Sequence, residues 1–347
     1  MTKHSGKVMT VRGPIEPHKL GITMMHEHLL IELSRFFAEP SGAAEKKRAH
    51  GPVTIEALGW IRTHEANHLE NLRLDDEALA IKEVDSYKRA GGGGIVDVTP
   101  RGIGRDPSGL KSVSEKTGIN VIAGTGYYVG AAHPKEVVKK SVADIAREIV
   151  DEMDSGIAET GVRPGIIGEI GTSDPLLDGE KKVLRAAARA QKETGASISI
   201  HPGRQERSPM KVLEVLRSEG ATMERVVMGH LDRTVGDMAG LKELAKQGCG
   251  LEFDMFGFDG HYAWSDFPVP NDAGRIELIA NLVEGGFVDQ IVVAQDVCTK
   301  VQLKRYGGYG YSHILENALD WMRTRGLSQK QLDKILIDNP RRFLTLA

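Results

Sequence analysis

The sequence predicts an α/β fold, a (β/α)8 TIM barrel in which eight parallel strands alternate with helices. Eight short apolar runs, each followed by glycine or polar residues, recur along the chain, and longer amphipathic stretches separate them. Most runs are rich in β-branched residues and nearly unbroken, as is typical of strands buried on both faces of a parallel sheet. Glycine accounts for 40 of 347 residues. That share exceeds the average of roughly 7% and fits many tight strand-to-loop turns.

The predicted elements follow one another in a regular order. The eight predicted strands lie within 22–30, 93–100, 119–126, 164–171, 196–203, 224–230, 249–257 and 289–296. Amphipathic periodicity predicts helices between them, most clearly over 133–157, 179–195 and 210–220. Gly195 and Gly220 end two of these stretches, and glycine commonly follows the last residue of a helix.

We expect residues 1–347 to form a single domain, because no linker, repeat or low-complexity segment interrupts the alternation. Residues 8–20 precede the first strand and are expected to form a small cap or hairpin. Residues 31–75 form a long first strand-to-helix connection. Such loops on the carboxyl face of a barrel usually help to build its site.

Charge and composition exclude several classes of protein. The net charge of −3 provides no basic field for nucleic acid or an anionic membrane. The two cysteines, Cys249 and Cys298, are far apart, which excludes a disulfide framework or a cysteine-rich zinc site and favours a reducing, cytoplasmic location. There is no window of 18 apolar residues and no signal-peptide pattern. The expected partner is therefore a small-molecule substrate.

Polar residues end five of the predicted strands, where a barrel carries its catalytic groups. They are His26, His28, Glu169, His201, His230 and Asp296. His26 and His28 are two residues apart, so both side chains point to the same face of the strand. Four imidazoles and two carboxylates at one barrel mouth suit a pair of divalent metal ions.

A structural explanation exists for each of these residues alone. A histidine at a strand end is more often a hydrogen-bonded core residue than a ligand, Glu169 could pair with an arginine, and Asp296 could cap a helix. Burying all six without metal would, however, require six separate partners. The set as a whole therefore favours a binuclear metal centre.

Several motifs resemble the phosphotriesterase family of the amidohydrolase superfamily. RGPIEPHKLGITMMHEHLL at 12–30 is similar to the opening of that family, with its HxH on the first strand. The likeness continues through INVIAGTGYY (119–128), SIHPG (199–203), GHLDRT (229–234), VVAQD (292–296), GGYGYSHILEN (307–317) and DNPRRFL (338–344). It thus covers nearly the whole chain.

The resemblance implies a role for each candidate ligand. His26, His28 and Asp296 are similar to the ligands of the more buried metal ion, and His201 and His230 to those of the more exposed one. The family uses a hydroxide shared by the two metals as nucleophile. Zinc is the metal that we expect, with manganese, cobalt or iron as alternatives, and the resemblance also implies a homodimer.

The sequence departs from the family pattern at three positions. Glu169 stands where the best-known members carry a carboxylated lysine, and this resembles the phosphotriesterase-related subgroup with its bridging glutamate. Met255 replaces the histidine of organophosphate hydrolases and the arginine of lactonases, and Arg233 replaces a relay aspartate. The resemblance therefore extends to the metal centre and leaves the substrate open.

The favoured function is hydrolysis of a small carboxylic ester, lactone or amide, with Asp296 as the proton acceptor and with incidental phosphotriesterase activity. Likeness to the glutamate-bearing subgroup favours an amide. Tyr128, which matches a lactonase tyrosine, favours a lactone and is a candidate substrate contact, as is Trp264 in the loop after the seventh strand. An organophosphate triester hydrolase is the alternative within the family.

Two alternatives come from other classes of protein. His64-Glu65-Ala66-Asn67-His68 matches the HExxH motif of zinc proteases and lies in a predicted helix. No sequence feature identifies a third ligand for it, so a surface helix is favoured. A non-catalytic binding protein is the second alternative, and the intact ligand set argues against it.

Overall fold

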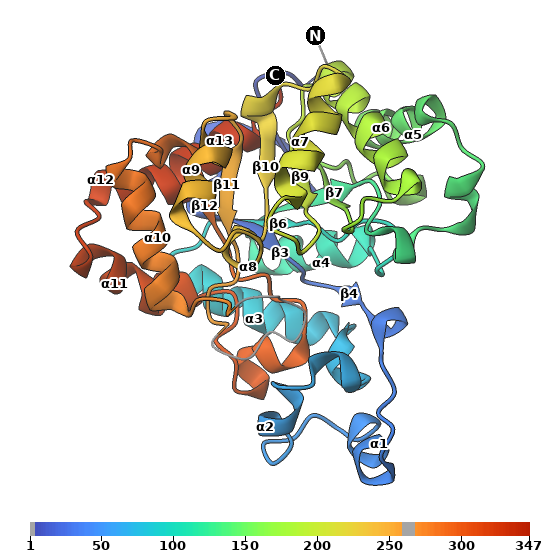
Figure 1. The fold of residues 1–347 in the computed structure, drawn as a ribbon, viewed down its shortest axis with the longest axis vertical. Coiled ribbons are helices and arrows are strands. Elements are labelled where there is room, and N and C mark those ends of the chain that lie inside the picture. Colours follow the sequence, from blue (N-terminus) through green and yellow to red (C-terminus); the bar gives the residue numbers. More distant parts are fainter. Residues whose placement is uncertain (1–3, 259–267) are drawn as a thin grey trace.

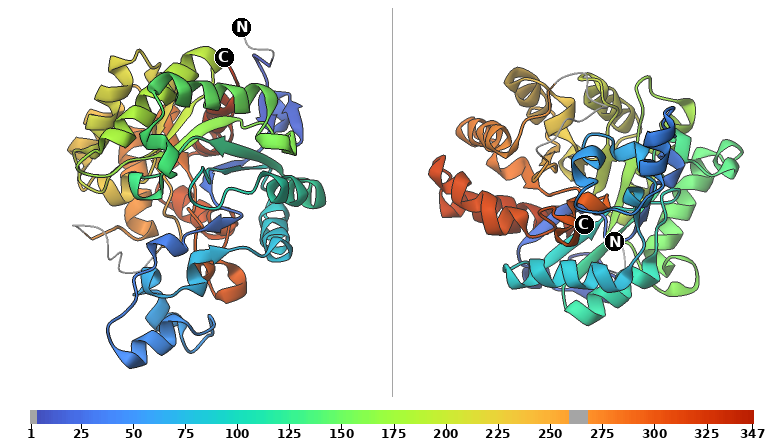
Figure 2. Two further views of the ribbon diagram at one scale, coloured as in Figure 1. Left: turned by 90° about the vertical axis from the view of Figure 1, so that its right-hand side faces the viewer. Right: turned by 90° about the horizontal axis from the view of Figure 1, so that it is seen from below.

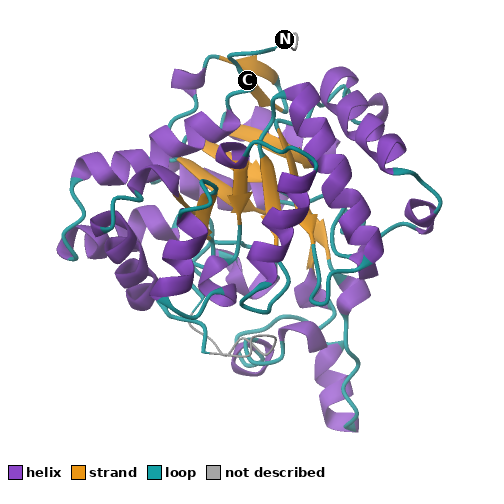
Figure 3. Cartoon of the chain, turned by 45° about the horizontal axis from the view of Figure 1, so that its top comes forward, coloured by secondary structure: helices purple, strands orange, loops and turns teal. Residues whose placement is uncertain are grey.

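The computed structural model describes residues 4–258 and 268–347. Eight parallel strands form a nearly closed barrel that helices surround, which confirms the predicted fold (Figures 1 and 3). The strands follow chain order around the barrel, and each lies inside a predicted run. They are β3 (Thr23–Glu27), β6 (Gly94–Asp97), β7 (Asn120–Thr125), β8 (Ile166–Gly171), β9 (Ile198–His201), β10 (Val226–Met228), β11 (Gly250–Phe253) and β12 (Ile291–Val293).

Alternation along the strands divides the apolar side chains between two clusters. Val96, Ile122 and Val227 belong to a cluster inside the barrel, which Phe343 and Leu344 close at the amino ends of the strands. Their chain neighbours, such as Ile95, Val121 and Val226, pack outwards with the surrounding helices. Because one end of the interior is filled with apolar side chains, the polar residues of the same strands gather at the other end.

Helices cover the outside of the barrel between successive strands. They are α3 (Glu77–Arg89), α4 (Pro107–Thr117), α5 (Val142–Ser155), α6 (Asp178–Thr194), α7 (Ser208–Ser218), α8 (Leu231–Thr234), α9 (Met238–Ala245) and α10 (Asp272–Glu284). Three more follow β12: α11 (Leu319–Thr324), α12 (Gln329–Asp333) and α13 (Asn339–Leu344). In the part of the chain that the structure describes, none of the helices combines the length and apolarity that a membrane crossing requires.

The helix predicted over 133–157 begins later than expected. Residues 135–138 form only a 3-10 turn, and α5 starts at Val142. The Ser141 hydroxyl accepts a hydrogen bond from the Asp144 amide, and the Asp144 carboxylate accepts one from the Ser141 amide. This capping box fixes the start of the helix. At the ends of α6 and α7, Gly195 and Gly220 adopt the left-handed backbone of a helix stop, with φ of 68° and 79°.

The first segment forms a hairpin of β1 (Val8–Thr10) and β2 (Gly13–Ile15) beside the amino ends of the barrel strands. The long first connection contains α1 (Ala43–Ala49), α2 (Leu58–Ile61) and the paired strands β4 (Ile31–Glu32) and β5 (Arg73–Leu74). Its helices α1 and α2 project beyond the carboxyl ends of the barrel strands (Figures 1 and 2). This connection therefore extends the side of the molecule that carries the candidate site.

The helix predicted around the HExxH motif is absent. Residues 64–68 follow α2 as a 3-10 turn over Glu65–Asn67, so the two histidines do not lie one turn apart on a continuous α-helix. The His64 ring instead stacks on Trp60, with ring centroids 4.8 Å apart. The His68 Nδ1 atom accepts a hydrogen bond from the Asn71 amide. Local ring stacking and side chain-to-backbone bonding have replaced the helix.

Glu152 of α5 connects this helix with the segment that follows β6. Its carboxylate accepts two hydrogen bonds from the Arg105 guanidinium, at 2.8 and 2.9 Å, and also pairs with Arg101. Burial opposes ionisation, but Arg105 and Arg101 outweigh it and hold the pKa of Glu152 at about 2, below its usual 4.5. The folded protein therefore stabilises the charged form of this side chain.

This pKa predicts how stability depends on pH. Because the folded-state pKa lies below the unfolded value, the stabilisation is complete above about pH 4.5 and is lost as pH falls towards 2. We expect Glu152→Gln to lower the free energy of unfolding by about 3 kcal/mol at pH 7 and by clearly less at pH 3. Urea denaturation at both pH values measures this. The exposed Glu159→Gln is the control, and a deficit independent of pH would contradict the assignment.

Candidate functional site

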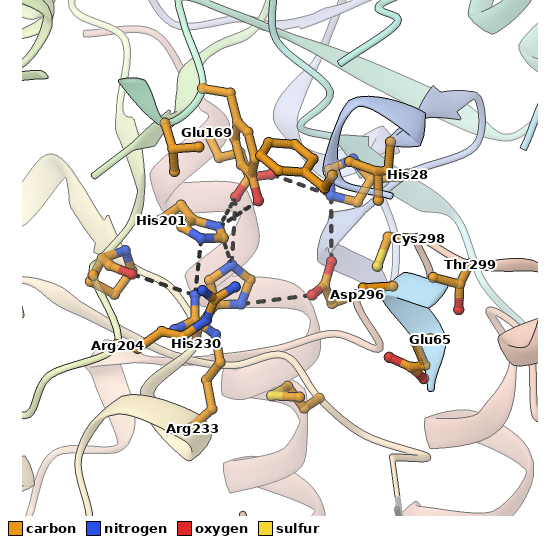
Figure 4. Close-up of a pocket in the computed structure, with 18 of the residues that line it drawn as sticks. His28, Glu65, Glu169, His201, Arg204, His230, Arg233, Asp296, Cys298 and Thr299 are labelled. Carbon is orange, nitrogen blue, oxygen red and sulfur yellow. Dashed lines mark hydrogen bonds and ion pairs between the residues drawn. The ribbon is translucent and has the colours of Figure 1, made fainter. Parts of the chain in front are cut away.

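The six candidate ligands lie together at the carboxyl ends of the barrel strands. His26 lies in β3, Glu169 in β8 and His201 at the end of β9. Three residues stand just beyond strand ends: His28 after β3, His230 after β10 and Asp296 after β12. Five of the six line a cavity of about 470 Å³, and His26 is fully buried beneath it. Figure 4 shows the five side chains that line the cavity converging on one another.

Glu169 occupies the centre of the cluster. Its Oε2 atom is 2.9 Å from His201 Nδ1 and 3.5 Å from His230 Nε2. Its Oε1 atom is 3.4 Å from His28 Nε2, and Oε2 also lies 3.5 Å from His26 Nε2. One carboxylate thus reaches imidazoles on both sides, which is the geometry that a bridging ligand requires.

The donor atoms fit divalent metal ions. His26 Nε2 is buried and has no hydrogen-bond partner among the described residues, although it faces two carboxylates. Ligand atoms within 4.8 Å of one another form four overlapping sets here, and three of them contain only the predicted ligands: His26, His28 and Glu169; His26, His230 and Asp296; and Glu169, His201 and His230. The fourth set joins His26 to Glu252 and Asp254. Nitrogen and oxygen donors in this combination suit zinc and similar cations.

Hydrogen bonds to residues outside the set of candidate ligands orient three of the imidazoles. His28 Nδ1 lies 2.8 Å from Thr99 Oγ1, and His230 Nδ1 lies 2.8 Å from Asp254 Oδ1. His26 Nδ1 is 3.2 Å from Glu252 Oε2. Because the outer nitrogen of each ring is held in this way, Nε2 points to the centre of the cluster, as in many metal sites.

Sequence reasoning missed two acidic residues that make these hydrogen bonds, Glu252 in β11 and Asp254 directly after it. They alternate with apolar residues in LEFDMF, and a charged residue at every second position of a buried strand was the available signal. Burial opposes ionisation of Asp254, but His230 and His26 hold its pKa at about 2. Asp254 is therefore a charged partner for the His230 ring.

Electrostatics favour the ligand form of Glu169 and His201. Burial opposes protonation of His26, His28 and His230, but neighbouring carboxylates outweigh it and raise the pKa of all three, that of His28 to about 9. Burial opposes ionisation of Glu169, yet His201 and His26 hold its pKa well below its usual value. Burial, together with His230 and the Arg233 guanidinium, holds the pKa of His201 well below its usual range. An ionised carboxylate next to a neutral imidazole is the protonation state that metal binding requires.

Glu27, which lies between His26 and His28 in the sequence, fixes the position of Asp296. Its Oε1 atom accepts hydrogen bonds from the backbone and side-chain amides of Gln295, both at 2.7 Å, and Oε2 accepts one from the Val297 amide at 2.9 Å. The Asp296 amide donates to the His26 carbonyl at 3.2 Å. Glu27 thus holds both neighbours of Asp296 while its own side chain points away from the metal ligands.

The other residues that the sequence singled out lie partly in the cavity wall and partly away from it. The Tyr128 hydroxyl lies 3.3 Å from His201 Nδ1 and lines the cavity, whereas Trp264 falls outside the described residues. Met255 and Arg233, which with Glu169 are the three departures from the family pattern, also line the cavity. His64 and His68 belong to none of the candidate metal groups in the described part of the chain. Glu65 lines the cavity, which the sequence did not indicate.

The fold and this cluster define a barrel hydrolase. The sequence model of the phosphotriesterase family matches residues 6–344, and the chain belongs to that family. An N-acetyltaurine hydrolase from Salmo salar is 44% identical over 348 residues, which cover 99% of each chain.

Solved structures agree with this assignment. A resiniferatoxin-binding protein from Rhodobacter sphaeroides superposes with a TM-score of 0.96 at 38% identity, over 99% of this chain and 98% of that one. A lactonase from Listeria monocytogenes gives a TM-score of 0.80 at 26% identity, over 98% of this chain and 99% of that one. The relatives thus include proteins named for amide hydrolysis and for lactone hydrolysis.

The contacts of Glu27 generate a prediction. Both side-chain oxygens accept hydrogen bonds from N–H groups, so the amide of Glu27→Gln must place an NH2 group against a donor. We expect the free energy of unfolding to fall by about 1–3 kcal/mol, the usual cost of a buried unsatisfied polar group. Thermal denaturation measures this, with the exposed Glu214→Gln as control. A variant as stable as the wild type would show that Glu27 does not hold this segment.

Proposed function

We propose that this protein uses two divalent metal ions to hydrolyse the amide bond of a small N-acyl amino sulfonate, with N-acetyltaurine as the first candidate. One observation carries the proposal: a Glu169-centred cluster of six ligands opens into a small cavity. Support for the substrate comes from a protein 44% identical over the whole chain that is named N-acetyltaurine hydrolase.

The family resemblance assigns the residues that would hold the metals, and the proximity of the donor atoms is compatible with that assignment. His26, His28 and Asp296 would bind one ion, His201 and His230 the other, and Glu169 would bridge them. Zinc is the expected metal, with manganese, cobalt and iron as alternatives. When bound, two such ions supply an activated water and polarise the substrate carbonyl.

Asp296 is the residue best placed to move the proton. Its side chain is 20% exposed, whereas the other five candidate ligands are at most 10% exposed, so it is the most accessible of the six to a substrate. It accepts the proton of the attacking water and delivers it to the leaving nitrogen, which must be protonated before the C–N bond breaks. Apolar side chains of the cavity wall, including Phe36 and Leu72, would contact the short acyl chain.

Lactone hydrolysis is the second candidate, and the position of Tyr128 favours it. The Tyr128 hydroxyl stands beside His201 at the mouth of the site, where it can donate to a ring oxygen or a carbonyl. The same hydroxyl can orient an amide carbonyl. The amide proposal is preferred because the N-acetyltaurine hydrolase is more similar in sequence than the lactonase, at 44% against 26% identity.

A comparison of substrates tests the proposal. We expect metal-loaded protein to cleave N-acetyltaurine with a higher kcat/KM than simple lactones or aryl phosphotriesters, as measured by release of the amine. Asp296→Asn should lower kcat by about 10²-fold or more, since it removes the proton acceptor. Preferential turnover of lactones or phosphotriesters, with N-acetyltaurine left intact, would overturn the amide proposal.

Metal content provides a separate prediction. Elemental analysis of protein purified without chelator should approach two divalent ions per chain. Glu169→Gln should lose affinity for both ions, because an amide keeps the shape of the side chain and removes the charge that two dications share. The His64→Ala, His68→Ala double variant should keep both ions. Loss of metal in that variant, with full retention in Glu169→Gln, would place the metal at the HExxH motif.

Glu169 as the bridging ligand also predicts the conditions under which metal-free protein rebinds the two ions. Glutamate is a permanent carboxylate, so metal-free protein should rebind two ions in carbonate-free buffer, and added bicarbonate should not increase the amount bound. Equilibrium dialysis followed by elemental analysis measures this. A requirement for bicarbonate would point to a carboxylated lysine as the bridge.

A further inference from the structure

Arg233 is a buried cation that has no anionic partner among the described residues. The whole residue is 1% exposed, and no described carboxylate forms an ion pair with its guanidinium. Arg275 is also fully buried, and its guanidinium pairs with the carboxylates of Asp232 and Asp272 at 2.9 and 2.8 Å. The two arginines differ in an important way, because an unpaired buried charge lowers the free energy of unfolding by several kcal/mol.

The Arg233 guanidinium belongs to the wall of the candidate active site. Its Nη2 atom lies 3.1 Å from His201 Nε2 and donates to the Pro202 carbonyl at 3.4 Å. Both contacts are to neutral groups, so neither balances the charge. Arg204 lines the same cavity, and Figure 4 shows the two arginines on the side of His201 and His230.

The opposite side of the cavity has a different character. Glu65 lies there near Asp296, Cys298 and Thr299 (Figure 4). The two arginines thus lie on one side of the cavity, and the carboxyl groups of Glu65 and Asp296 lie on the other. Metal ions at the cluster would add further positive charge between the two sides. The cavity is therefore polarised, and its cationic side is the one with Arg233.

We propose that Arg233, assisted by Arg204, binds an anionic group at the amine end of the substrate, a sulfonate or a carboxylate. This inference rests on the proposed amide hydrolysis and defines its substrate class as N-acyl amines that carry an anion a few bonds from the amide nitrogen. A guanidinium suits such a group because its planar donors match the oxygens of a sulfonate or carboxylate. The bound anion would supply the charge that Arg233 lacks.

Kinetics with a matched pair of amides test the proposal. N-acetyltaurine and the uncharged N-acetylethanolamine share the acetyl amide and differ in the terminal group. We expect Arg233→Met to raise KM for N-acetyltaurine by about tenfold or more and to leave KM for N-acetylethanolamine unchanged. Arg233→Lys, which keeps the charge, should recover part of the loss. Arg207→Met removes the same charge from an exposed position nearby and should behave as the wild type.

A binding measurement separates this subsite from the hydrolytic function. Calorimetric titration with ethanesulfonate, which has no bond to hydrolyse, should show binding to the wild-type protein that Arg233→Met abolishes. Ethyl methyl sulfone, the uncharged counterpart, should not bind. If no amide is cleaved but ethanesulfonate binds through Arg233, the proposed function fails and the subsite stands.

Other results would overturn the proposed anion-binding subsite at Arg233. It is overturned if wild-type protein binds ethanesulfonate and the sulfone equally, or if Arg233→Met and Arg233→Lys keep the wild-type preference for N-acetyltaurine over N-acetylethanolamine. Elemental analysis of each variant accompanies these measurements, because Arg233 touches His201. Equal metal content shows that a change in KM arises from the lost guanidinium.

Discussion

The junction between the first and last barrel strands is the constraint on which the site depends. Among the described residues no strand ladder joins β12 to β3. The side chain of Glu27 instead accepts hydrogen bonds from the segment that follows β12, and the Asp296 amide donates to the His26 carbonyl. These segments carry three of the six candidate ligands: His26, His28 and Asp296. The contacts that close the barrel therefore also bring these candidate ligands together.

The distribution of polarity along the barrel axis explains why the chemistry is confined to one end. Apolar side chains fill the interior near the amino ends of the strands, so ionisable groups there would find no partners. At the carboxyl ends the buried carboxylates and imidazoles neutralise one another around Glu169, and Asp254 and Glu252 support the imidazoles from behind. Arg233 contacts this network through His201 but has no carboxylate partner among the described residues, which distinguishes it from the buried Arg275.

The fold and the candidate ligands could be predicted because both depend on local sequence. Apolar runs mark the strands, and a polar residue at a run's end marks the barrel mouth. Glu252 and Asp254 escaped notice because their partners come from distant strands, and Glu65 because the first connection folds over the site. The prediction of a helix over HEANH was wrong, because stacking of the His64 ring on Trp60 and the contacts of a 3-10 turn outweighed the helical pattern of these residues. The contacts of Glu252, Asp254 and Glu65 join residues far apart in the chain, and a single sequence carries little sign of them.

Two candidate ligands have an unusual backbone, which affects how substitutions at these positions should be interpreted. His230 and Asp296 adopt positive φ angles of 52° and 47°, a left-handed conformation that side chains with a branch or bulk near the backbone disfavour. Asparagine and aspartate tolerate it better than alanine does. An alanine scan would therefore combine the loss of a ligand with a backbone penalty and overstate the contribution of the side chain. Asparagine at either position isolates the chemistry from the conformation.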